Sequence, residues 1–205
     1  MVKTVIIADD HPFTVEGMES VIQGLSTLKV VGTATNGIEA IALTKRLQPD
    51  CAILDLSMPG ANGLEVFQEA KQYSPHTRFI IVTGISAATL FKQLYDAGVD
   101  GIFVKNTPPD VISAGIISVS EGQRIISDEA MKAIESVRTL ENLSKRELDV
   151  LKALSRGLTN KKIAEELGVS PKTIDNHRTN LLKKMEVNST AALLMAAMRN
   201  GLIDI

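Results

Sequence analysis

Acidic, hydroxyl and basic side chains end four short apolar runs in the first half of the sequence. The runs are VIIADD, CAILD, FIIVT and GIFVK, and they end on Asp9, Asp10, Asp55, Thr83 and Lys105. Continuous apolar runs separated by helix-like segments are typical of strands buried on both faces of a parallel sheet. Because such sheets bind ligands beyond the carboxyl ends of their strands, we expect these five side chains to converge on one site.

The three carboxylates predict a site for a divalent cation and a phosphoryl group. Like charges at close range repel, and Mg²⁺, a hard cation that prefers oxygen ligands, would relieve the repulsion. Asp9 and Asp10 are paired in the manner of metal ligands, whereas Asp55 stands alone before a Pro-Gly loop and is the better nucleophile. Lys105 offers a positive charge to phosphoryl oxygens and Thr83 a hydroxyl donor. Each residue alone has a simpler reading as a helix cap or strand end, so the joint placement carries the prediction.

The elements that must position these residues alternate along the first 121 residues. Strands are predicted near 3–8, 29–34, 51–55, 78–83 and 100–104, and helices over 12–25, 37–48, 63–73, 87–97 and 108–121. This alternation predicts an α/β fold with a doubly wound, five-stranded parallel sheet, as in flavodoxin-like and receiver-like proteins. Residues 122–142 show no strand pattern and only a weakly amphipathic stretch around 128–138, which predicts a partly helical linker.

The final third of the sequence predicts a second, smaller, all-α domain. Ser144 followed by Glu147 is a capping-box pattern at the start of the first helix. Ala164, Gly168 four residues later and Ile174 six residues beyond have helix-turn-helix spacing, with a close approach, a turn and an apolar contact between helices. The predicted helices cover 144–156, 160–167, 171–185 and 189–199.

Charge and hydropathy limit the possible compartments and partners. The formal net charge of −2 divides into −5 over residues 1–139 and +3 over residues 140–205, and a basic final part suits a polyanion as well as a solvated face. No apolar run approaches the length of about 18 residues that a membrane span needs, and no signal-peptide core is present. The sequence therefore predicts a globular, cytoplasmic protein without a membrane partner. Cys51, the single cysteine, is expected to be a small buried hydrophobe.

Residues 1–121 resemble the receiver domain of two-component response regulators. That family has an acidic pair after the first strand, a phospho-accepting Asp after the third, Thr or Ser after the fourth and Lys after the fifth, and all these positions are filled here. The resemblance implies that Asp10 and Asp55 bind Mg²⁺ directly and that Asp9 does so through water. It also implies that the Ser57 backbone carbonyl is a ligand and that Asp55 receives phosphate from a sensor histidine kinase. Enzymatic activity would be limited to Mg-dependent self-phosphorylation and self-dephosphorylation of Asp55.

One position departs from the receiver pattern. The family often carries an aromatic residue three places before the lysine, whose rotamer follows the threonine when phosphate arrives. That position is Ile102 here, and Phe103 is expected to point to the other face of the sheet. The departure leaves phosphorylation intact as an expectation, but it puts the usual aromatic relay in doubt.

Residues 143–201 resemble the DNA-binding domain of LuxR-type regulators, on the segment LSKRELDVLKALSRGLTNKKIAEELGVSPKTIDNHRTNLLKKM. Joined to a receiver, this domain places the chain in the NarL/FixJ-like subfamily of response regulators. The predicted organisation is a receiver over 1–121, a linker over 122–141 and a LuxR-type helix-turn-helix domain over 142–205.

The exposed face of the predicted recognition helix follows from its helical period. With Ile174 turned inward, a rotation of about 100° per residue puts Leu181 and Met185 on the buried side. Asn176 is expected to bond adenine and Asp175 a cytosine amino group, while the basic side chains touch phosphates. The predicted DNA contacts are Lys172, Thr173, Asp175, Asn176, Arg178, Thr179, Asn180, Lys183 and Lys184.

These features together predict a transcription factor switched by phosphorylation. The last predicted helix contains AALLMAAM, which is apolar nearly all round and suits a homodimer on promoter DNA. One alternative is a phosphohydrolase with Asp55 as covalent nucleophile, although Ser57 stands where that class needs a second acid. Another is a regulator that binds DNA constitutively and has lost control by phosphate.

Overall fold

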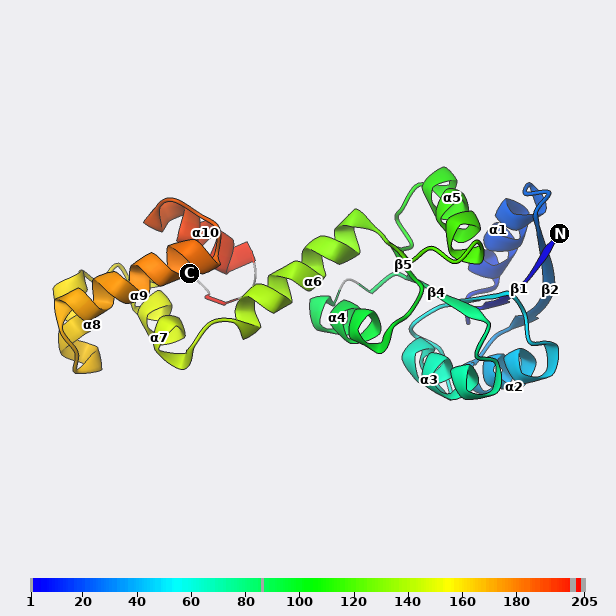
Figure 1. Ribbon diagram of the computed structural model, residues 1–205, viewed down its shortest axis with the longest axis horizontal. Coiled ribbons are helices and arrows are strands. Elements are labelled where there is room, and N and C mark those ends of the chain that lie inside the picture. The colour runs from blue at the N-terminus through cyan, green and yellow to red at the C-terminus, as the bar shows by residue number, and fades with distance from the viewer. Residues whose placement is uncertain (1, 86, 200–201, 204–205) are drawn as a thin grey trace. The chain divides into compact units, whose positions relative to one another are not determined.

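The computed structural model describes residues 2–85, 87–199 and 202–203, which belong to two compact units, residues 1–134 and 135–205. The first unit is an α/β domain and the second is built of helices (Figure 1). This confirms the predicted fold class. Within the described residues no helix is long and apolar enough to span a membrane.

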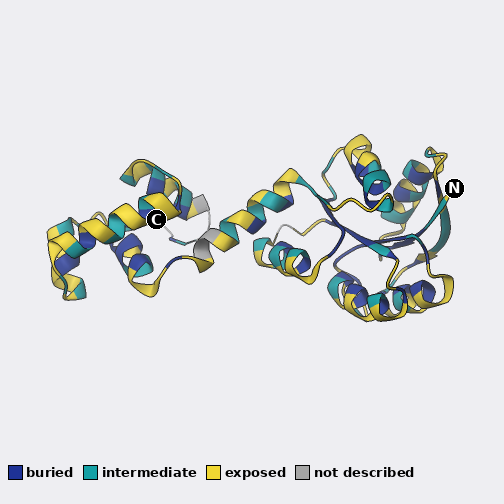
Figure 2. Ribbon diagram, viewed as in Figure 1, coloured by how far each residue is buried: buried dark blue, intermediate teal, exposed yellow. Residues whose placement is uncertain are grey.

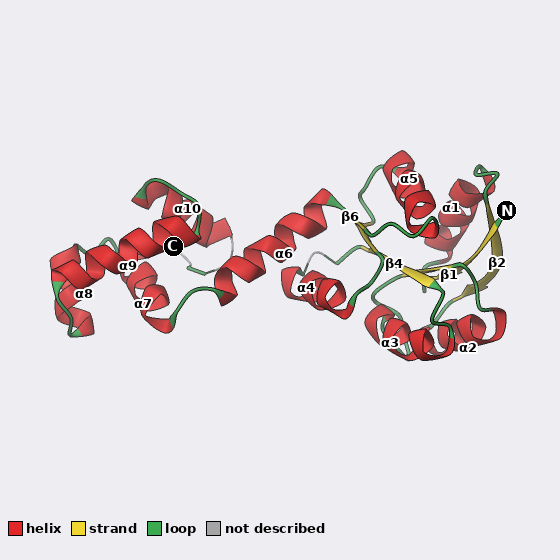
Figure 3. Ribbon diagram, viewed as in Figure 1, coloured by secondary structure: helices red, strands yellow, loops and turns green. Residues whose placement is uncertain are grey.

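The sheet of the first unit is parallel throughout, with the order β2-β1-β3-β4-β5-β6 among the described residues. Helices lie on both of its faces (Figure 3). The strands are β1 (Lys3–Ala8), β2 (Leu28–Ala34), β3 (Cys51–Leu54), β4 (Arg78–Thr83), β5 (Gly101–Val104) and β6 (Ile125–Ile126). The helices are α1 (Pro12–Gln23), α2 (Gly37–Leu47), α3 (Gly63–Tyr73), α4 (Ala88–Ala97), α5 (Pro109–Ser120) and α6 (Asp128–Glu141).

The sixth strand corrects the prediction of a five-stranded sheet and of a strand-free segment after residue 121. Ile125 and Ile126 pair with Gly101 and Ile102 of β5, and the Ser127 N–H then donates to the Ile102 carbonyl at 2.9 Å. A strand of two residues is too short to leave a periodic pattern in the sequence. Its pairing depends on a neighbouring strand that the sequence places more than twenty residues earlier.

The segment from Arg124 to Ile134 packs as part of the first unit. Ala130 and Ile134, on the first half of α6, are fully buried in one of the two cores of that unit. Arg124 donates from Nε to the Val99 carbonyl at 2.9 Å, and its guanidinium lies over the Tyr95 ring. The division between the two compact units therefore falls inside α6, after Ile134.

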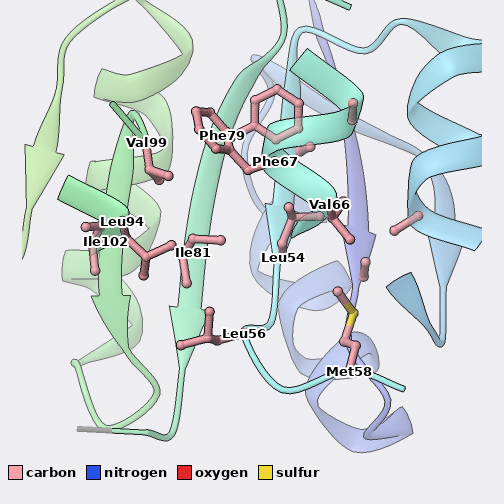
Figure 4. Close-up of a cluster of buried hydrophobic side chains, with 14 of the residues drawn as sticks. Leu54, Leu56, Met58, Val66, Phe67, Phe79, Ile81, Leu94, Val99 and Ile102 are labelled. Atoms are coloured by element: carbon pink, nitrogen blue, oxygen red, sulfur yellow. The ribbon is translucent and has the colours of Figure 1, made fainter. Parts of the chain in front are cut away.

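Alternation along the strands builds one core on each face of the sheet. The central strands β3, β4 and β5 are buried on both faces, while the helices expose their outer sides (Figure 2). Ile102 belongs to the core covered by α2, α3 and α4, together with Ile81 and Leu94 (Figure 4). Phe103 belongs to the core covered by α1 and α5. This confirms that the two neighbours point to opposite faces, and Ile102 has no exposed surface.

After the second half of α6, the second unit contains α7 (Lys145–Ser155), α8 (Asn160–Leu167), α9 (Pro171–Lys184) and α10 (Thr190–Arg199), which surround one apolar core. The predicted capping box is present, since Ser144 Oγ accepts from the Glu147 N–H and Glu147 accepts from the Ser144 N–H. Gly168 ends α8 with φ of 67°, a left-handed conformation that glycine adopts without a steric cost. The turn between α8 and α9 is therefore compatible with helix-turn-helix geometry.

Candidate functional site

Backbone hydrogen bonds continue past the ends of the strands and bring the polar residues at these ends to one edge of the sheet. The Asp55 N–H donates to the carbonyl of Ala8, the residue before Asp9, at 2.7 Å. On the other side of β4, the Lys105 N–H donates to the Thr83 carbonyl at 2.8 Å. The backbone thus fixes the starting point of each of these side chains before any side-chain contact is made.

Lys105 bridges the two buried carboxylates of this edge. Its Nζ lies 2.7 Å from Asp9 Oδ2 and 3.1 Å from Asp55 Oδ1, and the side chains are 26%, 4% and 3% exposed respectively. Burial lowers the pKa of Lys105, but its hydrogen bonds to Asp9 and Asp55 and their negative charges outweigh that effect, so the pKa lies above its usual value. The lysine stays charged and compensates two carboxylates that would otherwise repel each other.

The second oxygen of Asp55 is held by the loop that follows β3. The Ser57 N–H donates to Asp55 Oδ2 at 2.8 Å, so both oxygens of the carboxylate have partners. Gly63 begins α3 so close to this loop that a Cβ atom at its position would lie 2.5 Å from the Asp55 carbonyl oxygen. Sequence reasoning missed Gly63 as a residue that shapes the pocket, although the Asn-Gly pair at a predicted helix start was visible.

Asp10 lies on the exposed side of this group of carboxylates, beside His11. The imidazole Nδ1 of His11 is 2.8 Å from Asp10 Oδ1 and 3.1 Å from Asp9 Oδ1. Ligand atoms of Asp9, Asp10 and His11 lie within 4.8 Å of one another, which is compatible with a metal ion, and Asp55 is not a member of that group. His11 also stands at the N-cap position of α1.

Thr83 ends β4 in a fully buried position. Its Oγ1 accepts a hydrogen bond from the Ile85 N–H at 3.1 Å. No hydrogen bond joins its hydroxyl to Asp55 or Lys105 within the part of the chain that the structure describes. The hydroxyl proton can still be donated, because accepting one bond does not use it.

The face of α9 agrees with the helical projection. Ile174 and Leu181 are fully buried and Met185 nearly so. Thr173 and Arg178 are half-buried. The exposed members of the predicted set are Lys172, Asp175, Asn176, Thr179, Asn180, Lys183 and Lys184.

Lys184, a predicted phosphate contact, has partners within its own unit. Its Nζ donates to Glu147 Oε2 at 2.7 Å and to the Asn142 carbonyl at 2.9 Å. Burial raises the pKa of Glu147, but hydrogen bonds from Lys184 and Ser144 outweigh this and hold the pKa below its usual value. The ion pair fastens the end of α9 to the start of α7, a role that the sequence pattern did not reveal.

Arg178, another predicted phosphate contact, is also engaged. Its guanidinium donates to Asn160 Oδ1 and to Thr190 Oγ1, each at 2.7 Å. Neither Asn160 nor Thr190 was predicted as part of the site. A capping pattern was visible at Thr159-Asn160, but nothing in the sequence connects that position with Arg178.

Both units match known families. Residues 5–117 match the response regulator receiver domain, and residues 141–197 match the bacterial regulatory proteins of the luxR family. The nitrate/nitrite response regulator protein homolog of Haemophilus influenzae is 34% identical over 193 residues, covering 92% of each chain. Nitrate/nitrite response regulator protein NarP of Escherichia coli is also 34% identical, over 92% of this chain and 91% of its own.

A solved structure of RcsB from Salmonella enterica serovar Typhimurium, bound to a promoter in the presence of phosphomimetic BeF3−, aligns with a TM-score of 0.64. It is 26% identical and the alignment covers 96% of this chain and 98% of RcsB. With the pocket geometry and the exposed helix, these matches identify the architecture. The chain belongs to the two-component response regulators of the NarL/FixJ subfamily, DNA-binding transcription regulators in which a receiver domain precedes a LuxR-type helix-turn-helix domain.

Proposed function

We propose that phosphorylation of Asp55 switches this transcription regulator. The observation that carries the proposal is the bridge that Lys105 forms between Asp9 and Asp55. It places a positive charge beside the buried carboxylate of Asp55, which is not a helix cap. The remaining members of the site are Thr83, Asp10 and the Ser57 backbone carbonyl. A sensor histidine kinase is the proposed phosphate donor.

The donor set of the pocket fits Mg²⁺. Asp9, Asp10 and Asp55 would supply carboxylate oxygens and the Ser57 carbonyl another oxygen, and the single positive charge of Lys105 leaves an excess of negative charge among the three carboxylates. These residues would hold the ion. When bound, Mg²⁺ would neutralise the repulsion between carboxylate and phosphoryl oxygens and align the transfer.

The reaction assigned to Asp55 is a phosphoryl transfer. A carboxylate oxygen of Asp55 forms a bond to phosphorus while the bond from phosphorus to the histidine nitrogen of the kinase breaks, and that nitrogen retains the electron pair. Water would later cleave the acyl phosphate in self-dephosphorylation. Lys105 and the Thr83 hydroxyl would bind the phosphoryl oxygens, which requires Lys105 to share its donors with a third group.

No specific observation favours a phosphohydrolase. The residue two places after Asp55 is Ser57, which donates its N–H to Asp55 Oδ2 and has no carboxyl group to act as general acid.

The signal would leave the site through the core that contains Ile102. Thr83 ends β4 and Lys105 follows β5, the strand of Ile102, and the buried Ala130 and Ile134 of α6 lie in the same core as Ile102. Repacking of this core would therefore reach α6 without an aromatic relay. To move the population from mostly inactive to mostly active, phosphate must favour the active state by about 5 kcal/mol.

The output is binding of promoter DNA by α9. Its exposed Lys172, Asn176, Thr179 and Lys183 form one polar face that can enter a major groove. Met195 and Met198 of α10 are 63% and 42% exposed, which supports an apolar contact between two copies in a homodimer. A regulator of bacterial promoters works in the cytoplasm, where we place this chain.

The proposal is tested by labelling and footprinting. The chain is incubated with acetyl phosphate and Mg²⁺, beside Asp55→Asn and, as a matched control, the variant Asp50→Asn. We expect acyl phosphate on the unaltered chain and on Asp50→Asn, none on Asp55→Asn, and a genomic DNA footprint that strengthens with labelling. Labelling of Asp55→Asn would refute the assignment of Asp55, and equal footprints with and without phosphodonor would favour a constitutive DNA binder.

A further inference from the structure

A chain of polar side chains crosses the helix-turn-helix unit. The Asn160 Nδ2 amide donates to Asp175 Oδ1, and Arg178 Nη1 donates to Asn160 Oδ1 at 2.7 Å. Arg178 Nη2 continues the chain to Thr190 Oγ1, also at 2.7 Å. Asn160 is the first residue of α8 and Thr190 the first of α10, so one guanidinium joins the starts of two helices to α9.

The chemistry of arginine makes this connection rigid. The guanidinium is planar and holds its donors in a fixed fork, and here two of them end on acceptors from different helices. Arg178 lies three residues after Asp175, which is the spacing at which side chains are neighbours on a helix surface. Arg178 and Asp175 therefore lie on the same side of α9, and Asn160 bonds to both side chains.

Asp175 is oriented by this arrangement. Asn160 engages its Oδ1, and its Oδ2 accepts no hydrogen bond from any side chain or backbone group in the ranges that the structure describes. Asp175 is exposed on the same helix as the proposed base-contacting Asn176. A carboxylate oxygen is an acceptor for the amino group of cytosine in the major groove.

We propose that Arg178 is a positioning residue for DNA recognition, which ties α8 and α10 to α9 and, through Asn160, orders Asp175 to read a cytosine. The inference rests on the proposed binding of DNA by α9. It gives Arg178 a positioning role in place of the phosphate contact that the sequence predicted for it. A phosphate contact and a positioning role predict different results when DNA affinity is measured. Each phosphate contact contributes a slope of about 0.9 to the dependence of log affinity on log salt, whereas an ordered base reader contributes discrimination between sequences.

The experiment compares variants that separate charge from geometry. Arg178→Lys retains the charge but replaces the fork by a single ammonium that cannot hold two acceptors in this plane. Thr190→Val removes one acceptor without a change of charge, and Thr190→Ser is its matched control because it keeps the hydroxyl. Lys183→Gln serves as the reference for the loss of a phosphate contact.

The full chain, treated with acetyl phosphate, is first used to enrich sequences from a pool of duplexes with a randomised core. Affinities for an enriched duplex and a scrambled duplex are then measured over a series of salt concentrations. Each variant is also melted, so that binding is compared only below the unfolding transition.

We expect Arg178→Lys and Thr190→Val to lower the preference for the enriched duplex about tenfold, the cost of one mismatched base pair, with an unchanged salt slope. Thr190→Ser should retain the preference, and Lys183→Gln should reduce the slope by about 0.9 with little change of preference. Selection with Arg178→Lys should lose a cytosine that the unaltered chain requires.

Full preference in Arg178→Lys, which keeps the charge but loses the planar fork, would overturn the inference and restore the phosphate contact. Retained preference in Thr190→Val would overturn the role of Thr190 as an anchor. If the unaltered chain enriches no sequence with or without phosphodonor, the proposed DNA binding itself fails, and the inference fails with it.

Discussion

Removing the positive charge of Lys105 should destabilise the first unit. A double variant in which Asp55 is also changed tests the physical reason. In Lys105→Met the straight side chain is retained, while Asp9 and Asp55 lose the ammonium that lies 2.7 Å and 3.1 Å from their oxygens. Breaking a buried ion pair on one side costs about 3 to 5 kcal/mol. Because Lys105 is 26% exposed, water takes over part of its role, and we expect about 2 to 3 kcal/mol.

The neighbouring carboxylates set the sign of the coupling. Asp55→Asn alone removes the pairing of Lys105 with Asp55. In the Lys105→Met background that pairing is already absent, and the substitution removes one of two repelling charges. The double variant should therefore be less destabilised than the sum of the single variants, by about 1 to 2 kcal/mol. Mg²⁺ should stabilise Lys105→Met more than the unaltered chain, since it restores a cation to the site.

Tyrosine fluorescence is a suitable assay because the chain has no Trp and both of its tyrosines, Tyr73 and Tyr95, lie in the first unit. Urea unfolding followed in this way, with and without a chelator, reports that unit alone. Lys29→Met, at an exposed position of β2, is the control and should stay within about 0.5 kcal/mol of the unaltered chain. An unfolding midpoint in Lys105→Met equal to the control, or strict additivity in the double variant, would refute the compensation of two carboxylates by one lysine.

Further expectations concern packing and pH. Gly63→Ala should cost about 1 to 3 kcal/mol and reduce acetyl phosphate labelling, because its Cβ would lie 2.5 Å from the Asp55 carbonyl oxygen, whereas Gly17→Ala has nothing within 4 Å and should label normally. Equal labelling of the two variants would contradict the close approach. Ile134→Ala should shift the urea transition seen by tyrosine fluorescence by about 2 to 5 kcal/mol, since this fully buried residue packs in the first unit, and an unmoved transition would show that α6 is not docked there. The pKa of Glu147 lies below its usual value of 4.5 in the folded chain. The ionised side chain therefore stabilises the second unit fully above pH 4.5, and this stabilisation is lost as the pH falls through the lowered pKa. Glu147→Gln should therefore destabilise the second unit at neutral pH by about 1 to 3 kcal/mol and flatten its acid transition in far-ultraviolet circular dichroism, and an acid transition identical to that of the unaltered chain would contradict this.

Local patterns determined the secondary structure closely. The predicted strands over 3–8 and 78–83 and the helices over 63–73 and 160–167 have the same bounds in the structure. Periodicity, caps and glycines act within a few residues, so the sequence contains them directly. Within the residues that the structure describes, the strand that the sequence missed is β6, because two residues show no period.

The sequence by itself also determined which residues end the strands and which face of α9 is exposed, since parallel strands end at one edge and a helix has a fixed period. Only the tertiary structure decided the partners of the charged side chains. Lys105 bridges two carboxylates, and Arg178 bonds to residues that lie 18 and 12 positions away in the sequence. Long flexible cations reach several acceptors, and the packing of elements that are distant in the sequence selects among them. The residue types thus indicated a phosphate switch and a DNA reader. The fold determined which charged side chains pair with one another and which remain exposed to solvent.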